Sequence, residues 1–163
     1  MAQFIHLADE RLIGRIKKTG IKPHTVWRLK TKHVFATPVL KDFMVSHQWL
    51  RELKRRGIRT IAAVQFRIPD GDPVRVGHYG QDHLETTAAE AVQVFRQHHS
   101  GLGLEVLIPR KIEPDEVTRI YVPTQLVGWR FYPAAKGQKP CGCPYCARGE
   151  INSRKRREAY ERE

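Results

Sequence analysis

Hydrophobic and polar positions in this chain recur with two periods, and each period predicts one kind of secondary structure. Apolar residues that alternate with polar ones predict strands, and apolar residues three or four positions apart predict helices. The pattern predicts strands at 4–8, 33–37, 60–68, 74–78, 104–109, 117–123 and 125–132, and helices at 10–19, 42–56 and 88–98. Helices that precede mostly hairpin-linked strands favour an α+β fold, with an antiparallel or split sheet flanked by helices.

Turn and capping residues define two of these elements more sharply. Thr87 and Glu90 stand three positions apart before an apolar run, which is the pattern of a capping box at the start of the third helix. Residues 69–73, Pro-Asp-Gly-Asp-Pro, are a strong turn signal between two strands. We therefore expect strands 60–68 and 74–78 to pair with each other as a hairpin.

The composition of the chain changes after Pro133. The chain has 163 residues, which is enough for one domain with a hydrophobic core. From residue 134 on, Lys, Gly, Pro, Cys and Arg dominate, so we expect a domain at 1–133 and a Cys-rich, basic appendage at 134–163. No apolar run reaches membrane-spanning length, and the first residues lack a secretory leader pattern. These features predict a cytoplasmic protein with no membrane partner.

Charge is the largest departure from an average composition. The chain contains 29 Lys and Arg against 17 Asp and Glu, which gives a net charge of +12. An excess of this size favours a polyanionic partner, most often a nucleic acid. The alternative interpretation is a soluble surface rich in Lys and Arg, with no such partner.

The three cysteines of the chain lie within six residues of one another. Cys141, Cys143 and Cys146 share a tight turn with glycine and proline, which suits three thiolates converging on zinc. The fourth ligand would be a histidine from elsewhere, an acid such as Glu150, or a group of a second chain. No acid–base partner of the His-x-Glu kind is near, so we expect structural zinc. The alternative is a reduced thiol cluster without a metal.

Basic and aromatic residues flank the cysteine turn on both sides. Aromatic and cationic side chains mixed in this way suit stacking on bases together with neutralisation of phosphates. The candidate nucleic-acid contacts are Arg130, within an aromatic run, and Arg154, Lys155, Arg156 and Arg157. The alternative for the later run is a solvated helix end whose arginines pair with nearby glutamates.

Two polar side chains occur where the pattern predicts buried strands. His6 lies in the first strand and Glu105 in the strand at 104–109, each among apolar neighbours. A lone carboxylate in such a strand is costly unless a charged or hydrogen-bonding group meets it, so Glu105 is a candidate site residue. The alternatives are a histidine that is satisfied in the core, and an ion pair of Glu105 with Arg110 or Lys111 at a sheet edge.

Taken in order, these elements resemble the ADP-ribosyltransferase superfamily. The shared order is a strand with a histidine, a helix with a Gly-Ile-Lys-Pro exit, a Val-Phe-Ala-Thr strand, and a late strand with an acid before Ile-x-Pro-x-x-Val. The chain is most similar to the branch that uses a histidine, an aromatic residue and an acid, to which poly-ADP-ribose polymerases and diphtheria toxin belong. RNA 2′-phosphotransferases are a sister group on the same fold. The resemblance covers residues 3–123 and implies a split antiparallel sheet, with NAD as substrate.

The resemblance also implies a role for each matched residue. The ring of His6 would hydrogen-bond the NAD ribose, and the backbone at Leu7 would hold the nicotinamide amide. Phe35 would stack on nicotinamide, where the family more often has tyrosine, and Glu105 would be the catalytic acid. Taken alone, Phe35 would be interpreted as core packing.

The polar segment at 77–83 contains two glycines, Gly77 and Gly80, on either side of His78 and Tyr79. Glycines in such a segment indicate backbone close to a ligand, so Tyr79 and His78 are candidate contacts for a nucleobase or for the adenosine end of NAD. The alternative, which the residues alone favour slightly, is a strand end and turn before the helix that Thr87 caps.

The expected function is NAD-dependent transfer of ADP-ribose to a nucleic acid, with release of nicotinamide. Cleavage of the bond between nicotinamide and ribose leaves an oxocarbenium-like centre, which a carboxylate stabilises. One alternative is an RNA 2′-phosphotransferase with NAD as acceptor, for which Arg110 and Arg130 are candidate phosphate ligands. Another is a non-catalytic, zinc-containing nucleic-acid-binding protein. Many enzymes that attach ADP-ribose are toxins, so an antitoxin or regulatory protein is a candidate partner.

Overall fold

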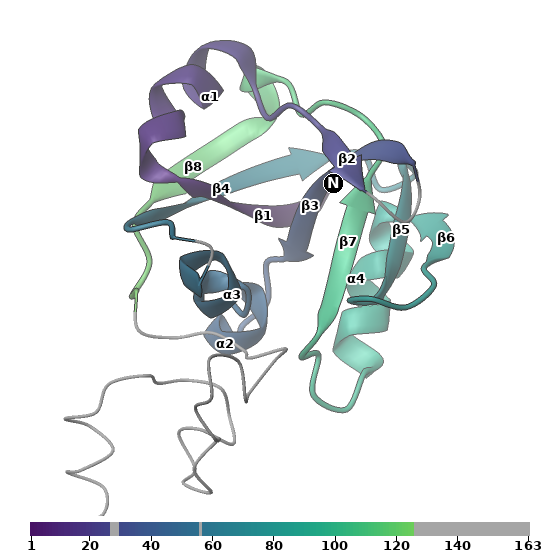
Figure 1. The fold of residues 1–163 in the computed structure, drawn as a ribbon. Helices are drawn as coiled ribbons and strands as arrows, with labels where there is room; N and C mark the ends of the chain where they lie inside the picture. The colour runs from purple at the N-terminus through teal and green to yellow at the C-terminus, as the bar shows by residue number, and fades with distance from the viewer. Residues whose placement is uncertain (27–29, 56, 126–163) are drawn as a thin grey trace, which may run out of the picture.

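The computed structural model describes residues 1–26, 30–55 and 57–125 of the chain (Figure 1). The strands are β1 (Ala2–Asp9), β2 (His24–Val26), β3 (Thr31–Pro38), β4 (Ile61–Ile68), β5 (Pro73–His78), β6 (Leu84–Thr87), β7 (Leu104–Ile108) and β8 (Val117–Tyr121). The helices are α1 (Ile13–Thr19), α2 (Phe43–Ser46), α3 (Leu50–Arg55) and α4 (Ala88–Gln97), with short 3-10 helices η1 (Glu10–Leu12) and η2 (Pro114–Glu116).

All strand pairs of the described chain are antiparallel, which confirms the α+β prediction. The strand order is β6-β5-β7-β3-β1-β4-β8, with β2 beside β3. β1 pairs with β4 along its whole length, but it shares only two register pairs with β3, Phe4–Pro38 and Ile5–Thr37. The sheet therefore has two halves, β1-β4-β8 and β3-β7-β5-β6, which diverge from a short junction and run in different directions (Figure 1).

The main hydrophobic core lies between one face of the sheet and helices α1 and α4. Phe4 of β1 and Phe66 of β4 are fully buried, with ring centroids 6.0 Å apart. Ile16 of α1 and Phe95 of α4 belong to the same buried cluster. The predicted first and third helices thus bury their apolar stripes against the sheet, as the sequence pattern requires.

Helix α2 lies on the opposite face of the sheet. The side chain of Thr37 points to the face of β3 opposite to that of the core residues. Its hydroxyl donates to the Ser46 carbonyl oxygen in α2 at 2.6 Å. Helix α3 contacts β4, and its first residue, Leu50, is fully buried. Side chains that point to this second face are therefore sheltered by α2 and α3.

The capping box at the start of α4 is confirmed. The Glu90 amide donates to the Thr87 hydroxyl at 3.3 Å, and the Thr87 amide donates to the Glu90 carboxylate at 3.1 Å. Gly20, where the first helix was expected to stop, has a φ of +74° at the end of α1. A residue with a side chain rarely adopts this conformation, which is why the helix ends at a glycine.

The single helix predicted at 42–56 is wrong, because the chain turns between α2 and α3. Gln48 is fully buried at this turn, and its amide donates to the carbonyl oxygens of Val45 and Gly101 at 3.1 and 3.0 Å. In a continuous helix the Val45 carbonyl would accept from the amide of Trp49. A buried side-chain amide anchored 53 residues away therefore overrides the helical spacing of the apolar residues.

The hairpin predicted between strands 60–68 and 74–78 is also wrong. β4 pairs with β1 and β8, whereas β5 pairs with β6 and β7. The predicted turn at 69–73 is present, and it connects β4 in one half of the sheet to β5 in the other. The amides of Ala88 and Ala89 donate to the carbonyl oxygens of Asp72 and Asp70, so the start of α4 holds the turn in place.

Several predictions concern residues outside the described ranges. These are the strand at 125–132 beyond its first residue, the appendage at 134–163, the cysteines at 141, 143 and 146, and the basic residues Arg130, Arg154, Lys155, Arg156 and Arg157. Within the described ranges, no helix has the length and apolar character needed to cross a membrane.

Candidate active site

β1 and β3 diverge beyond the pair Ile5–Thr37, and we call this point the fork. The side chain of His6 lies at the fork. Its Nδ1 lies 2.8 Å from the carbonyl oxygen of Phe35. Because a carbonyl can only accept, Nδ1 carries the proton and donates. Burial lowers the pKa of His6, and the bond to Phe35 opposes that shift only in part. The ring is therefore neutral at pH 7, and its Nε2 lone pair can accept a hydrogen bond from a hydroxyl.

The peptide groups of Leu7 face the same fork. The Gln3 carbonyl accepts from the Val39 amide at 2.9 Å, which places the peptide groups of Gln3 on the β3 side of β1. Peptide groups alternate sides along a strand, so those of Ile5 and Leu7 point the same way. The register between β1 and β3 ends at Ile5–Thr37. Leu7 therefore presents an N–H and a C=O that have no strand partner in β3, which suits a ligand carboxamide.

Phe35 and Glu105 point to the same face of the sheet. Phe35 pairs directly with Leu107, and Glu105 is two residues from Leu107 along β7. Direct antiparallel partners share a face, so Phe35 and Glu105 are diagonal neighbours roughly 7–8 Å apart. This face is the one that α2 covers.

The structure places two of the three matched residues, Phe35 and Glu105, on one face of the sheet. His6 contacts the backbone of Phe35, through the bond from its Nδ1 to the Phe35 carbonyl oxygen. Side chains alternate along β1, so that of His6 lies on the face opposite to that of Ile5. Its contact with Phe35 is therefore made at the fork, with the backbone carbonyl. Among the described residues, His6 and Glu105 make no direct hydrogen bond with each other.

Glu105 is a buried carboxylate with one hydrogen-bonding partner in the described part of the chain. The residue is 6% exposed, and its Oε1 lies 3.2 Å from Nε2 of His83. A buried carboxylate with so few bonds is costly, because burial removes the water that would otherwise solvate it. The remaining oxygen, Oε2, can accept from a ligand hydroxyl.

The ion pair of Glu105 with Arg110 or Lys111, one of the sequence alternatives, is absent from the described structure. Arg110 instead pairs with Asp72 and with Glu116, each at 2.6 Å. Lys111 pairs with Glu113 at 2.6 Å. These two cations are therefore engaged elsewhere, and neither pairs with Glu105.

His83 is a residue of the site that the sequence analysis did not single out. Its Nδ1 donates to the carbonyl oxygen of Gln81 at 3.0 Å, while its Nε2 faces the carboxylate of Glu105. The imidazole therefore bridges a backbone carbonyl oxygen and the Glu105 side chain. Of the two interpretations of segment 77–83, the structure supports the slightly favoured one, because β5 ends at His78, and Gly77 lies close to His83. This glycine is the sequence signal that could have pointed to His83.

His33 and Arg75 extend the polar surface beyond Phe35. Arg75 pairs directly with Leu107 in the sheet, so it points to the face of Glu105. Burial lowers the pKa of His33, and the charge of Arg75 lowers it further. Both residues line an open hollow of about 570 Å³ together with Thr31, Lys32, Pro73, Val74, Glu85, Thr86 and Pro109. No motif marks His33 or Arg75 in the sequence, and only the strand register brings them together.

Tyr79 directly follows the last residue of β5 and lies beside the start of β7, the strand that carries Glu105. Its amide donates to the Gly103 carbonyl at 2.8 Å, and its ring lies 5.3 Å from the ring of Trp49, between centroids. Packing on Trp49 explains part of its position. The contact of Tyr79 with a nucleobase or with adenosine stays a prediction.

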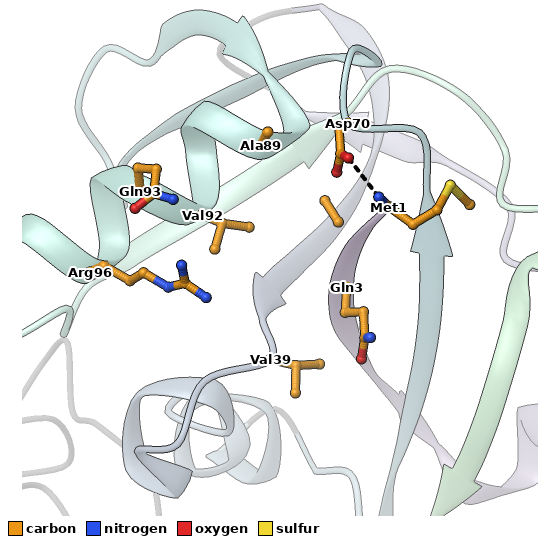
Figure 2. Close-up of a pocket in the computed structure, with 9 residues that line it drawn as sticks. Met1, Gln3, Val39, Asp70, Ala89, Val92, Gln93 and Arg96 are labelled. Atoms are coloured by element: carbon orange, nitrogen blue, oxygen red, sulfur yellow. Dashed lines mark hydrogen bonds and ion pairs between the residues drawn. The ribbon is translucent and has the colours of Figure 1, made fainter.

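A second hollow, of about 360 Å³, lies between the start of β1 and α4 (Figure 2). Its charged pair is the ammonium of Met1 and the carboxylate of Asp70, 2.6 Å apart and each 59% exposed. Arg96 and Gln93 of α4 complete its polar lining. No residue of the His6–Glu105 site lines this hollow, and none of its polar residues is buried, so it lacks the features of a catalytic site.

Comparisons with protein-family models, with curated proteins and with solved structures give no significant match for this chain. The comparisons therefore identify no family for this chain, and the resemblance to ADP-ribosyltransferases stays a prediction from the sequence. In the described ranges, no group of three His, Cys, Asp or Glu side chains could hold a metal ion. The cysteines predicted to bind zinc are not among the described residues.

Proposed function

We propose that this protein is an NAD-dependent ADP-ribosyltransferase that releases nicotinamide and transfers ADP-ribose to a nucleic acid. The observation that carries the proposal is the buried carboxylate of Glu105, which keeps one oxygen available on the face that Phe35 shares. The divergence of β1 from β3 is consistent with the split sheet of the superfamily that the sequence resembles.

The fork supplies groups that match the nicotinamide riboside half of NAD. Nε2 of His6 would accept a hydrogen bond from a ribose hydroxyl, and the peptide groups of Leu7 would bind the carboxamide. Phe35 would lie against the pyridinium ring, and a cation over an aromatic face gains roughly 0.5–2 kcal/mol. Together these contacts would fix the leaving group relative to Glu105.

In the proposed reaction, the bond between C1′ of the ribose and the pyridinium nitrogen breaks, and its electron pair goes to nicotinamide. C1′ then carries oxocarbenium-like positive charge, as in glycoside cleavage. The carboxylate of Glu105 at the ribose 2′-hydroxyl would stabilise this charge, an effect on the order of 3–4 kcal/mol for one preorganised group. An oxygen or nitrogen of the acceptor forms the new bond to C1′ and loses its proton.

Charge supports a nucleic acid as the acceptor. Residues 1–125 contain 20 Lys and Arg against 13 Asp and Glu, a net charge of +7, and residues 126–163 contain 9 against 4, a net charge of +5. The positive excess thus belongs to both parts of the chain, and a polyanion would be attracted to either. In this proposal the cysteines at 141, 143 and 146 bind structural zinc, and the basic residues around them contact the nucleic acid.

The test is incubation of the full-length protein with NAD and, separately, RNA, DNA and a protein mixture. We expect nicotinamide release and a mass increase of one ADP-ribose on a nucleic acid, both lost in Glu105→Gln. NAD should also raise the melting temperature, because a ligand at a hundredfold excess over its Kd stabilises by about 2.7 kcal/mol. Undiminished transfer by Glu105→Gln would contradict the proposal.

The two alternatives predict different products. A phosphotransferase would move phosphate from a 2′-phosphorylated oligonucleotide to NAD, but Arg110, one of its two candidate phosphate ligands, is engaged by Asp72 and Glu116. A non-catalytic nucleic-acid-binding protein would release no nicotinamide, and NAD would not change its melting temperature.

A further inference from the structure

We infer that His83 is the positioning residue for Glu105, an inference that rests on the proposed function. His83 lies in the loop before β6, 22 residues ahead of Glu105 in the chain. In the described structure its imidazole is the group that bonds to the Glu105 carboxylate, with Nε2 3.2 Å from Oε1. The side chains of His83 and Glu105 are 7% and 8% exposed, so water competes little for this contact.

The imidazole is itself held from two sides. Its Nδ1 donates to the Gln81 carbonyl at 3.0 Å, which fixes the ring plane within the loop. On the other side the ring lies against Gly77, the residue that pairs with Glu105 across β5 and β7. A Cβ at position 77 would come within 3.0 Å of the His83 Cγ and 2.8 Å of the Asp82 carbonyl oxygen. A glycine is therefore needed where the histidine crosses the strand to reach the carboxylate.

The position of Arg75 shows why a hydrogen bond that holds the Glu105 carboxylate in one orientation is useful. Arg75 points to the same face of the sheet as Glu105. An arginine in this position could pair with both carboxylate oxygens of Glu105 and leave neither available to a ligand. In the structure Arg75 pairs with Glu85 instead. His83 engages Oε1 alone, so the carboxylate is oriented while Oε2 stays available for a ribose hydroxyl. His33 interacts with the same groups, since burial lowers its pKa most and the charges of Arg75 and His83 lower it further.

The experiment compares steady-state kinetics of NAD turnover for full-length wild type, His83→Leu, His83→Gln and Gly77→Ala. Leucine removes the donor, whereas glutamine keeps an N–H of similar reach. We expect His83→Leu to lower kcat by roughly 10²-fold, since a misplacement of about 1 Å costs that much, with little change in KM for NAD. His83→Gln should recover most of kcat. Gly77→Ala should lower kcat without altering either member of the pair, because the new Cβ displaces the ring.

The outcomes separate this inference from the proposed function. If Glu105→Gln abolishes turnover but His83→Leu keeps the wild-type kcat, then His83 does not position Glu105, although the proposed function stands. If His83→Gln is as impaired as His83→Leu while both unfold at the wild-type urea midpoint, the hydrogen bond is not the operative feature and the inference fails. Absence of NAD turnover in the wild type would overturn both.

Discussion

Two carboxylate clusters of this protein, one around Arg110 and one around Glu105, use their hydrogen-bonding groups in opposite ways. Arg110 makes five hydrogen bonds, two to Asp72, two to Glu116 and one to the Lys111 carbonyl. Glu116 also accepts from the Glu113 amide at 2.8 Å. Glu105, by contrast, has a single bond among the described residues, although it is the more deeply buried of the two glutamates.

This difference separates a structural ion cluster from a candidate active site. The Arg110 cluster joins the turn after β4 to η2, and nearly every donor and acceptor in it is engaged. Its contribution to stability is therefore complete without a ligand. The Glu105 site leaves Oε2, Nε2 of His6 and the peptide groups of Leu7 available, and such groups are kept in a folded protein mainly where a ligand uses them.

The largest expected effect comes from removing one negative charge from each cluster in turn. Glu105→Gln should reduce nicotinamide release by roughly 10²–10³-fold, because it removes the group proposed to stabilise the transition state. Its free energy of unfolding should not fall, since a neutral amide costs less to bury than a carboxylate. Steady-state kinetics and urea unfolding measure the two quantities on the same preparations.

Glu116→Gln is the matched control for that experiment. It should leave turnover within a few-fold of wild type and lower the free energy of unfolding by about 1–3 kcal/mol, the cost of weakening bonds to a charged group. A result in which Glu116→Gln loses turnover and Glu105→Gln loses only stability would reverse the assignment of the two clusters.

A smaller effect is expected from Arg110→Met, which tests the structural cluster by itself. The substitution keeps most of the aliphatic stem and leaves Asp72 and Glu116 without their cation. Because the Arg110 side chain is 37% exposed, solvent screens part of the loss, and we expect about 2 kcal/mol of destabilisation. For a chain of this size that lowers Tm by roughly 4–8 °C. Calorimetry measures the shift, and kcat per folded molecule should not change.

The next effect is a loss of stability in mild acid. Burial lowers the pKa of His6, His33 and His47 below the usual 6.5. The unfolded chain therefore takes up these protons first as pH falls, so the stability they contribute is present above pH 6.5 and is lost below it. Each proton taken up on unfolding gives a slope of about 1.4 kcal/mol per pH unit. Urea unfolding at pH 7.5 and 5.5 should show lower stability at pH 5.5.

His47 provides the control for the acid effect. Its Nδ1 donates to the Phe43 carbonyl at 2.9 Å and its Nε2 bonds the Tyr121 hydroxyl at 2.7 Å, so both ring nitrogens are engaged, unlike those of His6. His47→Asn should reduce the pH slope without affecting NAD turnover. An unchanged slope would mean that His47 is not one of the groups that titrate on unfolding.

Local sequence signals predicted the elements well and their pairing poorly. The capping box at Thr87 and most strand positions follow from spacing within a few residues, and the structure confirms them. The break at Gln48 depends on Gly101, and the partner of β4 is β1 rather than the strand beyond the turn at 69–73. These outcomes are decided by contacts between distant segments, and no local pattern contains them.

The candidate site shows the same division. The order of histidine, aromatic residue and acid could be recognised in the sequence, because each stands in its own predicted strand. The contact of Glu105 with His83 could not, since the two residues come from segments with no shared motif. Gly77 indicated a close approach, but only the register of β5 with β7 identifies His83 as the group that approaches.

The smallest expected effect concerns Phe35, a residue of the Glu105 site. If it stacks on nicotinamide, Phe35→Leu should raise KM for NAD by roughly three- to tenfold, because an aromatic contact contributes about 0.5–1.5 kcal/mol beyond its buried area. Phe35→Tyr restores the residue type more common in the resembling family, keeps the ring, and should leave KM within about twofold, an effect well under 1 kcal/mol. Equal KM values for Phe35→Leu and wild type would show that the ring does not contact NAD, and Phe35 would then belong to the packing of β3 alone.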